Sequence, residues 1–199
     1  MTVYVGDIMC FGNRYKVSDF GLAKTVLTGS GSGTPVYSAP EVYTNNQTSV
    51  KSDIFSSEMT LFQLCNNYSD LGHWIKSLDP IINGKVISEI GYEAYVPRKI
   101  RAICNKACAF DPQDRFESVE AMRQALERLQ VLQDWQRDDD IKWHADVNGR
   151  LHRLEADQRK SFECVYTVSG RRKNSKCKFV ANLDEIKKWQ HKIVYDNTF

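Results

Sequence analysis

Apolar positions in the first two-thirds of the chain recur at the spacing expected of helices. From Ser49 onward they are dense enough for a helix buried on most sides, and they comprise Ile54, Leu61, Phe62, Leu64 and Cys65. After Pro97, which suits the first turn of a helix, they form a stripe of Ile100, Ile103, Cys104, Ala107 and Cys108. A short helix is expected from Leu71 and should end at Asp79–Pro80. The cap residue Ser118 predicts a further helix to Leu132, with Met122, Leu126 and Leu129 facing inward.

The last third of the chain alternates apolar and polar positions, as strands with one buried face do. Such segments are 141–147, 150–155, 162–168 and 177–181, with Phe179 expected on the inner face. Asn148–Gly149 joins the first two, and this dipeptide is a strong hairpin signal. Asn182 and Glu185 then resemble a capping box ahead of an amphipathic helix. The sequence therefore predicts an α+β protein: a mainly helical part followed by a small ββββα module.

Charge changes along the chain at the same place. Residues 1–140 carry 14 Lys and Arg against 18 Asp and Glu, a net charge of −4. Residues 141–199 carry 13 against 7, a net charge of +6. The acidic run Asp138–Asp140 marks a boundary, so we expect domains at 1–136 and 141–199.

Composition narrows the class of protein. The chain is 42% hydrophobic, which is enough to build a core, but it has no apolar run of membrane-spanning length and no signal peptide at its start. None of its six cysteines forms a Cys-x-x-Cys pair, and Cys104 and Cys108 suit packing on a helix better than a metal site. We therefore expect free thiols and a cytoplasmic location, with no membrane partner.

Two motifs in fixed order carry a family resemblance. The first is Asp19-Phe20-Gly21-Leu22-Ala23, and the second is Gly33-Thr34-Pro35-Val36-Tyr37-Ser38-Ala39-Pro40-Glu41. Together they resemble the activation segment of a eukaryotic-like Ser/Thr protein kinase. The later motif Asp111-Pro112-Gln113-Asp114-Arg115 resembles the end of the C-terminal lobe of such a kinase. The resemblance covers residues 1 to about 132.

The resemblance implies roles for several residues. Asp19 would hold Mg²⁺ against the nucleotide phosphates, and Phe20 would set the active or inactive geometry. Thr34 matches the Thr beside the catalytic loop of Ser/Thr-specific members. Glu41 would pair with Arg115 and tie the activation segment to the last helices.

Two acidic residues of the predicted long helix, Asp53 and Glu58, indicate what that helix contacts. Asp53 matches an Asp that accepts hydrogen bonds from the catalytic loop. It would here be solvated, paired with a new partner in the chain, or met by another polypeptide, because a buried carboxylate without partners is costly. Glu58 stands where the family has Gly, which suggests a rebuilt or exposed surface.

The groups that grip ATP are missing from the 18 residues ahead of Asp19. There is no Gly-rich loop, no Val-Ala-Ile-Lys strand and no helix bearing its partner Glu. Asp7 is a weak candidate for the catalytic base, and it could instead occupy the position of the Mg²⁺-binding Asn. We therefore expect a non-catalytic regulatory or interaction protein that needs no cofactor by itself. The alternative is one half of a split Ser/Thr kinase, which would use ATP and Mg²⁺ with a partner chain.

A basic patch in the module is the other candidate site, and it comprises Arg171, Arg172, Lys173, Lys176 and Lys178. It could contact an acidic protein, hold the phosphates of a nucleic acid, or be a solvated turn. No aromatic residue stands among these cations in the sequence, which counts against a stacking platform for single strands. We expect a protein partner or a homodimer, with a nucleic-acid-binding regulator as a further alternative.

Overall fold

The computed structural model describes residues 8–11, 14–17, 35–46, 48–158 and 161–198. Contacts divide the chain into two compact units. The first comprises Met1–Glu93 with Arg98–Arg128, and the second comprises Ala94–Pro97 with Leu129–Phe199. The second unit thus begins ahead of the acidic run at residues 138–140.

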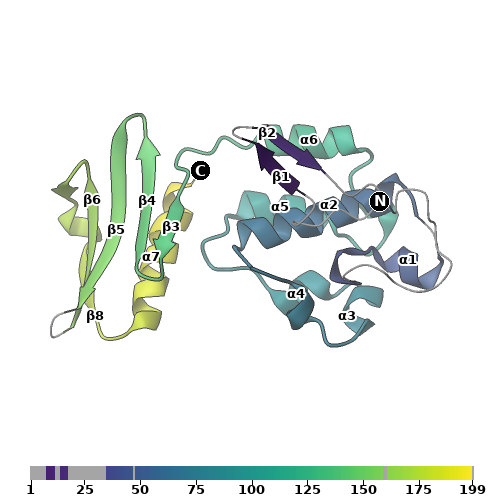
Figure 1. Cartoon of the computed structure of the whole chain (residues 1–199), viewed down its shortest axis with the longest axis horizontal. Helices are drawn as coiled ribbons and strands as arrows, with labels where there is room; N and C mark the ends of the chain where they lie inside the picture. Colours follow the sequence, from purple (N-terminus) through teal and green to yellow (C-terminus); the bar gives the residue numbers. More distant parts are fainter. Residues whose placement is uncertain (1–7, 12–13, 18–34, 47, 159–160, 199) are drawn as a thin grey trace. The chain divides into compact units, whose positions relative to one another are not determined.

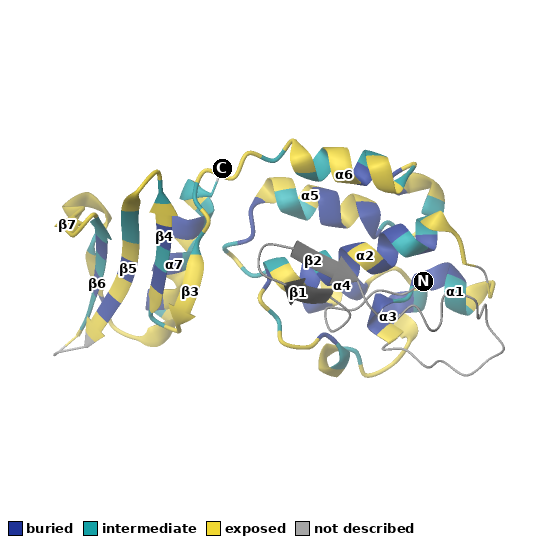
Figure 2. Ribbon diagram, turned by 45° about the horizontal axis from the view of Figure 1, so that its top comes forward, coloured by how far each residue is buried: buried dark blue, intermediate teal, exposed yellow. Residues whose placement is uncertain are grey.

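The first unit is built around the long helix α2, Val50–Cys65 (Figure 1). Ser49 caps it with a reciprocal capping box, because its hydroxyl accepts from the N–H groups of the first turn while the Ser52 hydroxyl accepts from Ser49 N at 2.8 Å. The helix is buried along most of its length, and its fully buried apolar residues are Ile54, Phe55, Met59 and Phe62 (Figure 2). These side chains centre the core of the unit on α2.

Short elements surround α2. The chain enters through the antiparallel hairpin of β1, Ile8–Phe11, and β2, Arg14–Val17. It continues through η3 (Pro35–Tyr37), α1 (Pro40–Thr44), η4 (Gly72–Trp74), α3 (Asp79–Ile82), α4 (Val86–Ile90), α5 (Arg98–Ala107), η5 (Pro112–Asp114) and α6 (Val119–Glu127). Several of them bring apolar side chains to the core on α2.

Two helix boundaries differ from the sequence-based prediction. Asp79–Pro80 begins α3 instead of ending a helix, because Pro lacks an N–H and fits the first helical turn. Helix α6 begins after its cap Ser118, but it ends at Glu127 and not at Leu132. The Leu132 N–H instead donates to the Thr198 carbonyl at 2.8 Å, within the second unit.

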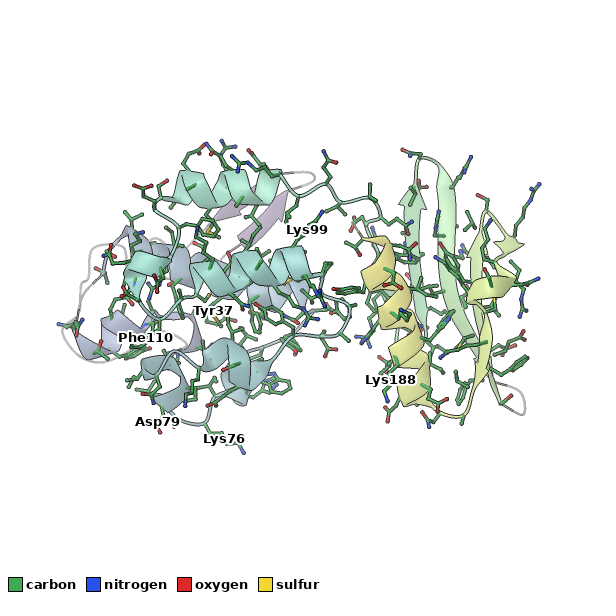
Figure 3. All side chains as sticks on the ribbon, turned by 180° about the vertical axis from the view of Figure 1, so that it is seen from behind. Tyr37, Lys76, Asp79, Lys99, Phe110 and Lys188 are labelled. Carbon is green, nitrogen blue, oxygen red and sulfur yellow. The ribbon has the colours of Figure 1, made fainter. Side chains whose placement is uncertain are left out.

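The second unit is an antiparallel sheet covered on one face by a helix. Its elements are β3 (Gln136–Asp139), β4 (Lys142–Val147), β5 (Arg150–Gln158), β6 (Phe162–Val168), β7 (Arg171–Arg172), η6 (Asn174–Lys176), β8 (Lys178–Val180) and α7 (Leu183–Asn197). The sheet runs β3-β4-β5-β6, and β7 and β8 both pair with the outer edge of β6. Helix α7 packs against one face of this sheet (Figure 3). Its residues Ile186, Trp189 and Ile193 share a core cluster with Trp143 and Leu154 of the strands. The α+β class is confirmed, but the sheet has two strands more than predicted.

The hairpin prediction at Asn148–Gly149 is confirmed, whereas the predicted phase of the last strand is wrong. Asn148 and Gly149 both have positive φ, 53° and 74°, as a two-residue hairpin turn requires. In β8, Val180 is buried and Phe179 is 67% exposed, the reverse of the expected alternation. Cys177 ends the turn η6 and precedes β8, so the apolar alternation expected from Cys177 onward does not continue into the strand.

Every helix among the described residues is too short or too polar to span a bilayer.

Candidate functional site

The described residues include only part of the sequence-predicted site. Asp7, Asp19, Phe20, Gly21 and Thr34 lie outside the described residues. The described members are Ala39, Pro40, Glu41, Asp53, Arg115 and the five cations of the basic patch. The structure brings Glu41 and Arg115 together, while the basic patch belongs to the other unit.

Glu41 and Arg115 form a buried, two-pronged ion pair. Arg115 Nη1 donates to Glu41 Oε1 at 2.7 Å, and Nη2 donates to Oε2 at 2.8 Å. The remaining Arg115 donors bind the backbone carbonyls of Lys51, Ala109 and Phe110. The Arg115 side chain has no exposed surface, and its guanidinium lies 5.1 Å from the ring centre of Phe55. A rigid planar fork suits this position because every buried donor has an acceptor.

The segment just ahead of Glu41 is held against α2. Val36 and Tyr37 of η3 are buried, and the Tyr37 hydroxyl donates to Gln63 Oε1 on α2. The Gln63 amide nitrogen donates in turn to the carbonyls of Tyr68 and Ser69, each at 3.1 Å. The segment from Tyr37 to Glu41 is therefore held to the rest of the unit at both of its ends.

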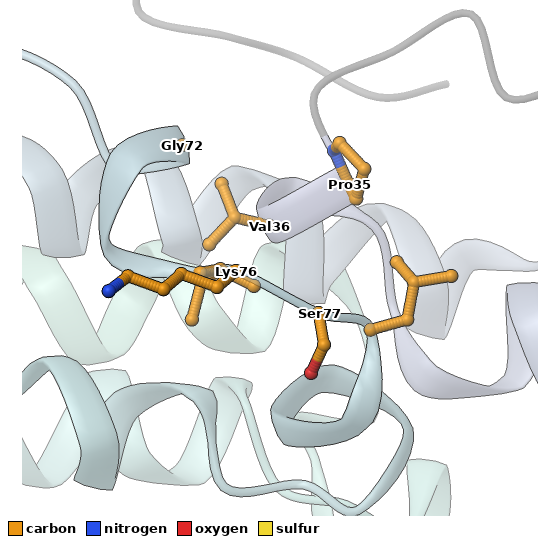
Figure 4. A pocket seen from close by; sticks show the side chains of 7 residues that line it. Pro35, Val36, Gly72, Lys76 and Ser77 are labelled. Atoms are coloured by element: carbon orange, nitrogen blue, oxygen red, sulfur yellow. The ribbon is translucent and has the colours of Figure 1, made fainter.

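A pocket of about 190 Å³ opens beside this fixed segment (Figure 4). It is lined mainly by Pro35, Val36, Ile75, Lys76, Ser77 and Leu78. Pockets for small molecules typically have about 300–1,000 Å³, whereas a cavity of about 150 Å³ can hold one benzene ring. The volume and the mostly apolar lining therefore suit a single apolar side chain better than a nucleotide.

The rim of the pocket is partly apolar and partly basic. Leu78 is 39% exposed, and Trp74 in the preceding turn is 47% exposed. Lys76 projects from the surface beside them (Figure 3). A ligand with an apolar group in the pocket and an acidic group next to it would meet both features.

Glu58 is an unusual residue at the centre of α2. It has no exposed surface, and neither carboxylate oxygen has a hydrogen-bond partner among the described residues. Burial raises the pKa of Glu58 to about 7, and the nearby Cys104 thiol, a weak donor, offsets only part of that effect. The prediction of an exposed surface at this position is therefore wrong, because Glu58 is buried beside the Cys104 thiol of α5.

Asp53 lies in the first turn of α2 and is partly buried. A carboxylate there is favoured by the positive end of the helix dipole. Among the described residues, no group of three or more His, Cys, Asp or Glu side chains is arranged to hold a metal ion.

The basic patch forms one edge of the sheet in the second unit, and we call Arg171–Lys178 the basic edge. Arg172 pairs with Glu163 at 2.7 Å, and Lys176 donates to Asn197 Oδ1 at 3.2 Å. Arg171, Lys173 and Lys178 have no acidic partner among the residues that the structure describes. The positive field reaches His152, whose pKa is lowered by burial and then by Lys176, Arg150 and Lys173.

Sequence reasoning missed three features of these sites. The pocket joins residues about 40 positions apart, and only the packing of η3 on α2 reveals it. The burial of Glu58 had a signal in the dense apolar pattern around it, but the charge outweighed that signal. The exposure of Phe179, next to Lys178 in the sequence, was missed because strict alternation was assumed. An edge strand need not alternate strictly, and Phe179 is exposed.

Comparison with known proteins assigns the first part of the chain. Residues 7–127 match the family described as "Protein kinase domain". The chain is 28% identical over 127 residues to the Tyrosine-protein kinase MasK of Myxococcus xanthus, a match that covers 60% of this chain and 20% of that protein. It is 33% identical over 106 residues to the Serine/threonine-protein kinase PknD of Chlamydia muridarum, covering 52% of this chain and 11% of that protein. The match thus spans about a fifth and about a tenth of these two relatives.

Proposed function

Because the chain belongs to the protein kinase domain family, we propose that it binds an extended segment of another protein beside the end of its activation segment. We further propose that it is the C-terminal-lobe part of that domain, and that the 199-residue polypeptide does not transfer phosphate by itself. It would act as an interaction or regulatory protein.

The pocket beside Pro35–Val36 is the observation that carries this proposal. It is held in place by buried Val36, by the Tyr37–Gln63 hydrogen bond and by the Glu41–Arg115 pair. A site fixed before the ligand arrives loses less conformational entropy on binding. Its volume selects one apolar side chain, and Lys76 favours an acidic residue next to it.

The proposal that these 199 residues do not transfer phosphate by themselves rests on the kinase motifs that they do not contain. Kinases in general use ATP and Mg²⁺, and they need a Lys, metal-binding groups and a base in position together. These 199 residues hold the Asp19 motif without the Gly-rich loop or the Val-Ala-Ile-Lys strand. Phosphate transfer would therefore need groups from outside these 199 residues.

A positional-scanning peptide array tests the binding proposal. Fluorescent peptides centred on Ser, Thr or Tyr are titrated with the full chain, with one neighbouring position fixed at a time. We expect a preference for an apolar residue at one position and for Asp or Glu beside it. The central residue also shows whether the chain prefers peptides centred on Ser or Thr to peptides centred on Tyr. Both are included because the named relatives are a tyrosine kinase and a serine/threonine kinase. An array without any positional preference would contradict the proposal.

Matched variants locate the binding surface. Leu78→Glu places a charge at the pocket and should weaken the selected peptide about ten-fold or more, the worth of one buried apolar side chain. Leu64→Glu is the control, because Leu64 is 52% exposed on α2 and does not line the pocket. Equal losses in both variants would place the binding elsewhere.

The second candidate is one half of a split kinase. It is favoured by the Glu41–Arg115 pair, which keeps the activation segment anchored although the chain alone lacks the groups that grip ATP. The test adds a separate polypeptide that carries the ATP-binding half of a protein kinase domain. Phosphate transfer that appears on mixing and disappears in Asp19→Ala would favour this candidate. Saturable micromolar binding of Mg·ATP by the chain alone would argue against the first proposal.

A further inference from the structure

The basic edge of the second unit combines cations that have no acidic partner with an exposed aromatic ring. The cations are Arg171, Lys173 and Lys178, judged against the residues that the structure describes. Phe179, next in the chain, is 67% exposed although it lies in a strand. The sequence pattern had placed this ring in the core, so the exposed ring is a new feature of the surface.

These groups follow the outer edge of β6, on β7, η6 and β8. Arg171 pairs with Val168 at one end of β6, and Lys178 pairs with Cys164 further along the same strand. Four residue steps separate those β6 positions, which corresponds to about 13 Å at about 3.3 Å per residue. The cations are therefore spread along an extended line and not gathered in a cluster, which suits a linear polyanion.

The cations also create a positive field that reaches neighbouring groups. His152 hydrogen-bonds the Tyr166 hydroxyl at 2.7 Å, and the Lys176 ammonium lies 5.2 Å from the centre of the Tyr166 ring. Lys176, Arg150 and Lys173 each lower the pKa of His152. An anion at this edge would therefore meet several cations at once.

Two observations argue against a protein strand or a second copy as the ligand. The turn η6 interrupts the edge, so an added peptide strand would find only Lys178–Val180 as a regular ladder. The acidic run on the opposite edge already has partners: Asp138 has the His144 imidazole at 2.9 Å, Asp139 has Lys142 at 3.8 Å, and Asp140 has Arg137. Among the described residues, neither edge therefore offers a long regular ladder or an acidic run without partners.

We propose that the basic edge binds single-stranded nucleic acid, with phosphates on Arg171, Lys173 and Lys178 and one base stacked on Phe179. A cationic track beside an aromatic ring is the usual arrangement for binding single strands without sequence preference. A duplex keeps its bases stacked inside, so it would use the cations but not the ring. The site lies outside the residues 7–127 matched by the kinase family.

The test measures fluorescence anisotropy of a labelled oligothymidylate and a labelled oligouridylate, each titrated with the full chain over a salt series. Their duplexes with the complementary strands are measured in parallel. We expect tighter binding of the single strands, with affinity falling as salt rises. Lys173→Ala or Lys178→Ala should reduce the slope of log affinity against log salt by about 0.7 for each phosphate that the variant no longer neutralises. Lys188→Ala, which removes a cation from α7, should leave the slope unchanged (Figure 3).

Substitutions of Phe179 separate stacking from apolar contact. Phe179→Leu should weaken single-strand binding by roughly ten-fold, the order of magnitude of one base–aromatic stack. Phe179→Tyr should retain the affinity. Circular dichroism is used to check that both variants fold. We expect that they do, because the Phe179 ring is mostly exposed.

Four results would each overturn the proposal. They are no binding at about 50 mM salt, equal affinity for the duplex, equal affinity of Phe179→Leu and Phe179→Tyr, and a change of slope in Lys188→Ala as large as in Lys178→Ala. Displacement of the oligonucleotide by polyglutamate of the same charge at equal concentration would instead identify a general site for acidic proteins, and it would also overturn the proposal.

Discussion

Arg115 binds both carboxylate oxygens of Glu41, a residue 74 positions earlier in the chain. The pair joins the first turn of α1 to the turn between α5 and α6. Three backbone carbonyls accept the other Arg115 donors, so the whole guanidinium is satisfied in a buried place. Because both carboxylate oxygens and all the guanidinium donors are engaged within the fold, we interpret this arrangement as structural.

Arg115→Ala should strongly destabilise the first unit. The substitution leaves Glu41 as an uncompensated carboxylate and three carbonyls without donors, and loss of one partner of a buried pair costs about 3–5 kcal/mol. Urea unfolding followed by peptide-resolved hydrogen exchange in α2 measures the effect on this unit.

Arg123→Ala is the matched control for Arg115→Ala. Arg123 pairs with Glu120 and Glu127 on the exposed face of α6, and such surface pairs contribute at most about 1 kcal/mol. If Arg115→Ala unfolded at the same urea concentration as Arg123→Ala, the anchoring role of Arg115 would be refuted.

Glu58 should make the first unit less stable as pH rises. Its pKa is about 7 in the folded chain, above the ordinary value of 4.5, so the folded state holds its proton more tightly than the unfolded state does. The contribution of Glu58 to the free energy of unfolding is therefore constant below about pH 4.5. It declines as the pH rises to about 7, and above that pH it stays at its lower value. Over that window the loss is about 3 kcal/mol.

Glu58→Gln removes this pH dependence, since the amide does not ionise. The measurement compares unfolding of the two chains at about pH 5 and about pH 8, on either side of most of that window, again through hydrogen exchange in α2. Glu127→Gln, an exposed acid on α6, serves as the control and should keep the slope of the parent. An equal decline in Glu58→Gln and the parent would show that another group is responsible.

Alanine substitutions at two glycines with positive φ distinguish the cost of backbone strain from the cost of a steric collision. Gly84 has φ of +66°, and a Cβ there would come within 2.7 Å of Phe110 Cβ. Gly91 has φ of +82°, and a Cβ there would meet nothing within 4 Å. Gly91→Ala should cost about 1–3 kcal/mol from the backbone alone, because φ 82° with ψ 172° is a region that essentially only glycine adopts. Gly84→Ala should cost about 1–3 kcal/mol more, because the packing must shift.

Urea unfolding of the two alanine variants, read in the peptides of α4 and α5, measures this difference. Phe110→Ala combined with Gly84→Ala should recover only the part of the extra loss that comes from the Phe110 ring, whose Cδ2 would lie 2.8 Å from the new Cβ, because alanine keeps the Phe110 Cβ. Identical midpoints for Gly84→Ala and Gly91→Ala would contradict the close packing of Phe110 on this turn.

Motifs and strong periodicity made much of this fold predictable from sequence. The dense apolar positions after Ser49 predicted α2, and Asn148–Gly149 predicted a hairpin because both residues tolerate positive φ. Strand β3 gave no such signal, since Gln136–Asp139 is polar and exposed throughout. Its place in the sheet depends on pairing with β4, which sequence alone does not encode locally.

The sites were less predictable than the fold, because they depend on contacts between distant segments. The motifs indicated Glu41 and Arg115, but the pocket beside Val36 arises only where η3 packs near residues 72–78. Phe179 shows the limit of strand periodicity, since the turn η6 shifts the phase of β8 by one residue. Glu58 shows that a charge in an apolar pattern does not by itself indicate exposure.

The most direct test of the proposed role is phosphate transfer by the purified 199-residue chain alone. Radiolabelled ATP with Mg²⁺ is mixed with a general protein substrate, and the Asp19→Ala chain is assayed in parallel. We predict that the two chains give the same background incorporation, because Asp19 lacks the other groups that grip ATP. Incorporation by the parent chain that is abolished in Asp19→Ala would contradict a binding role without catalysis.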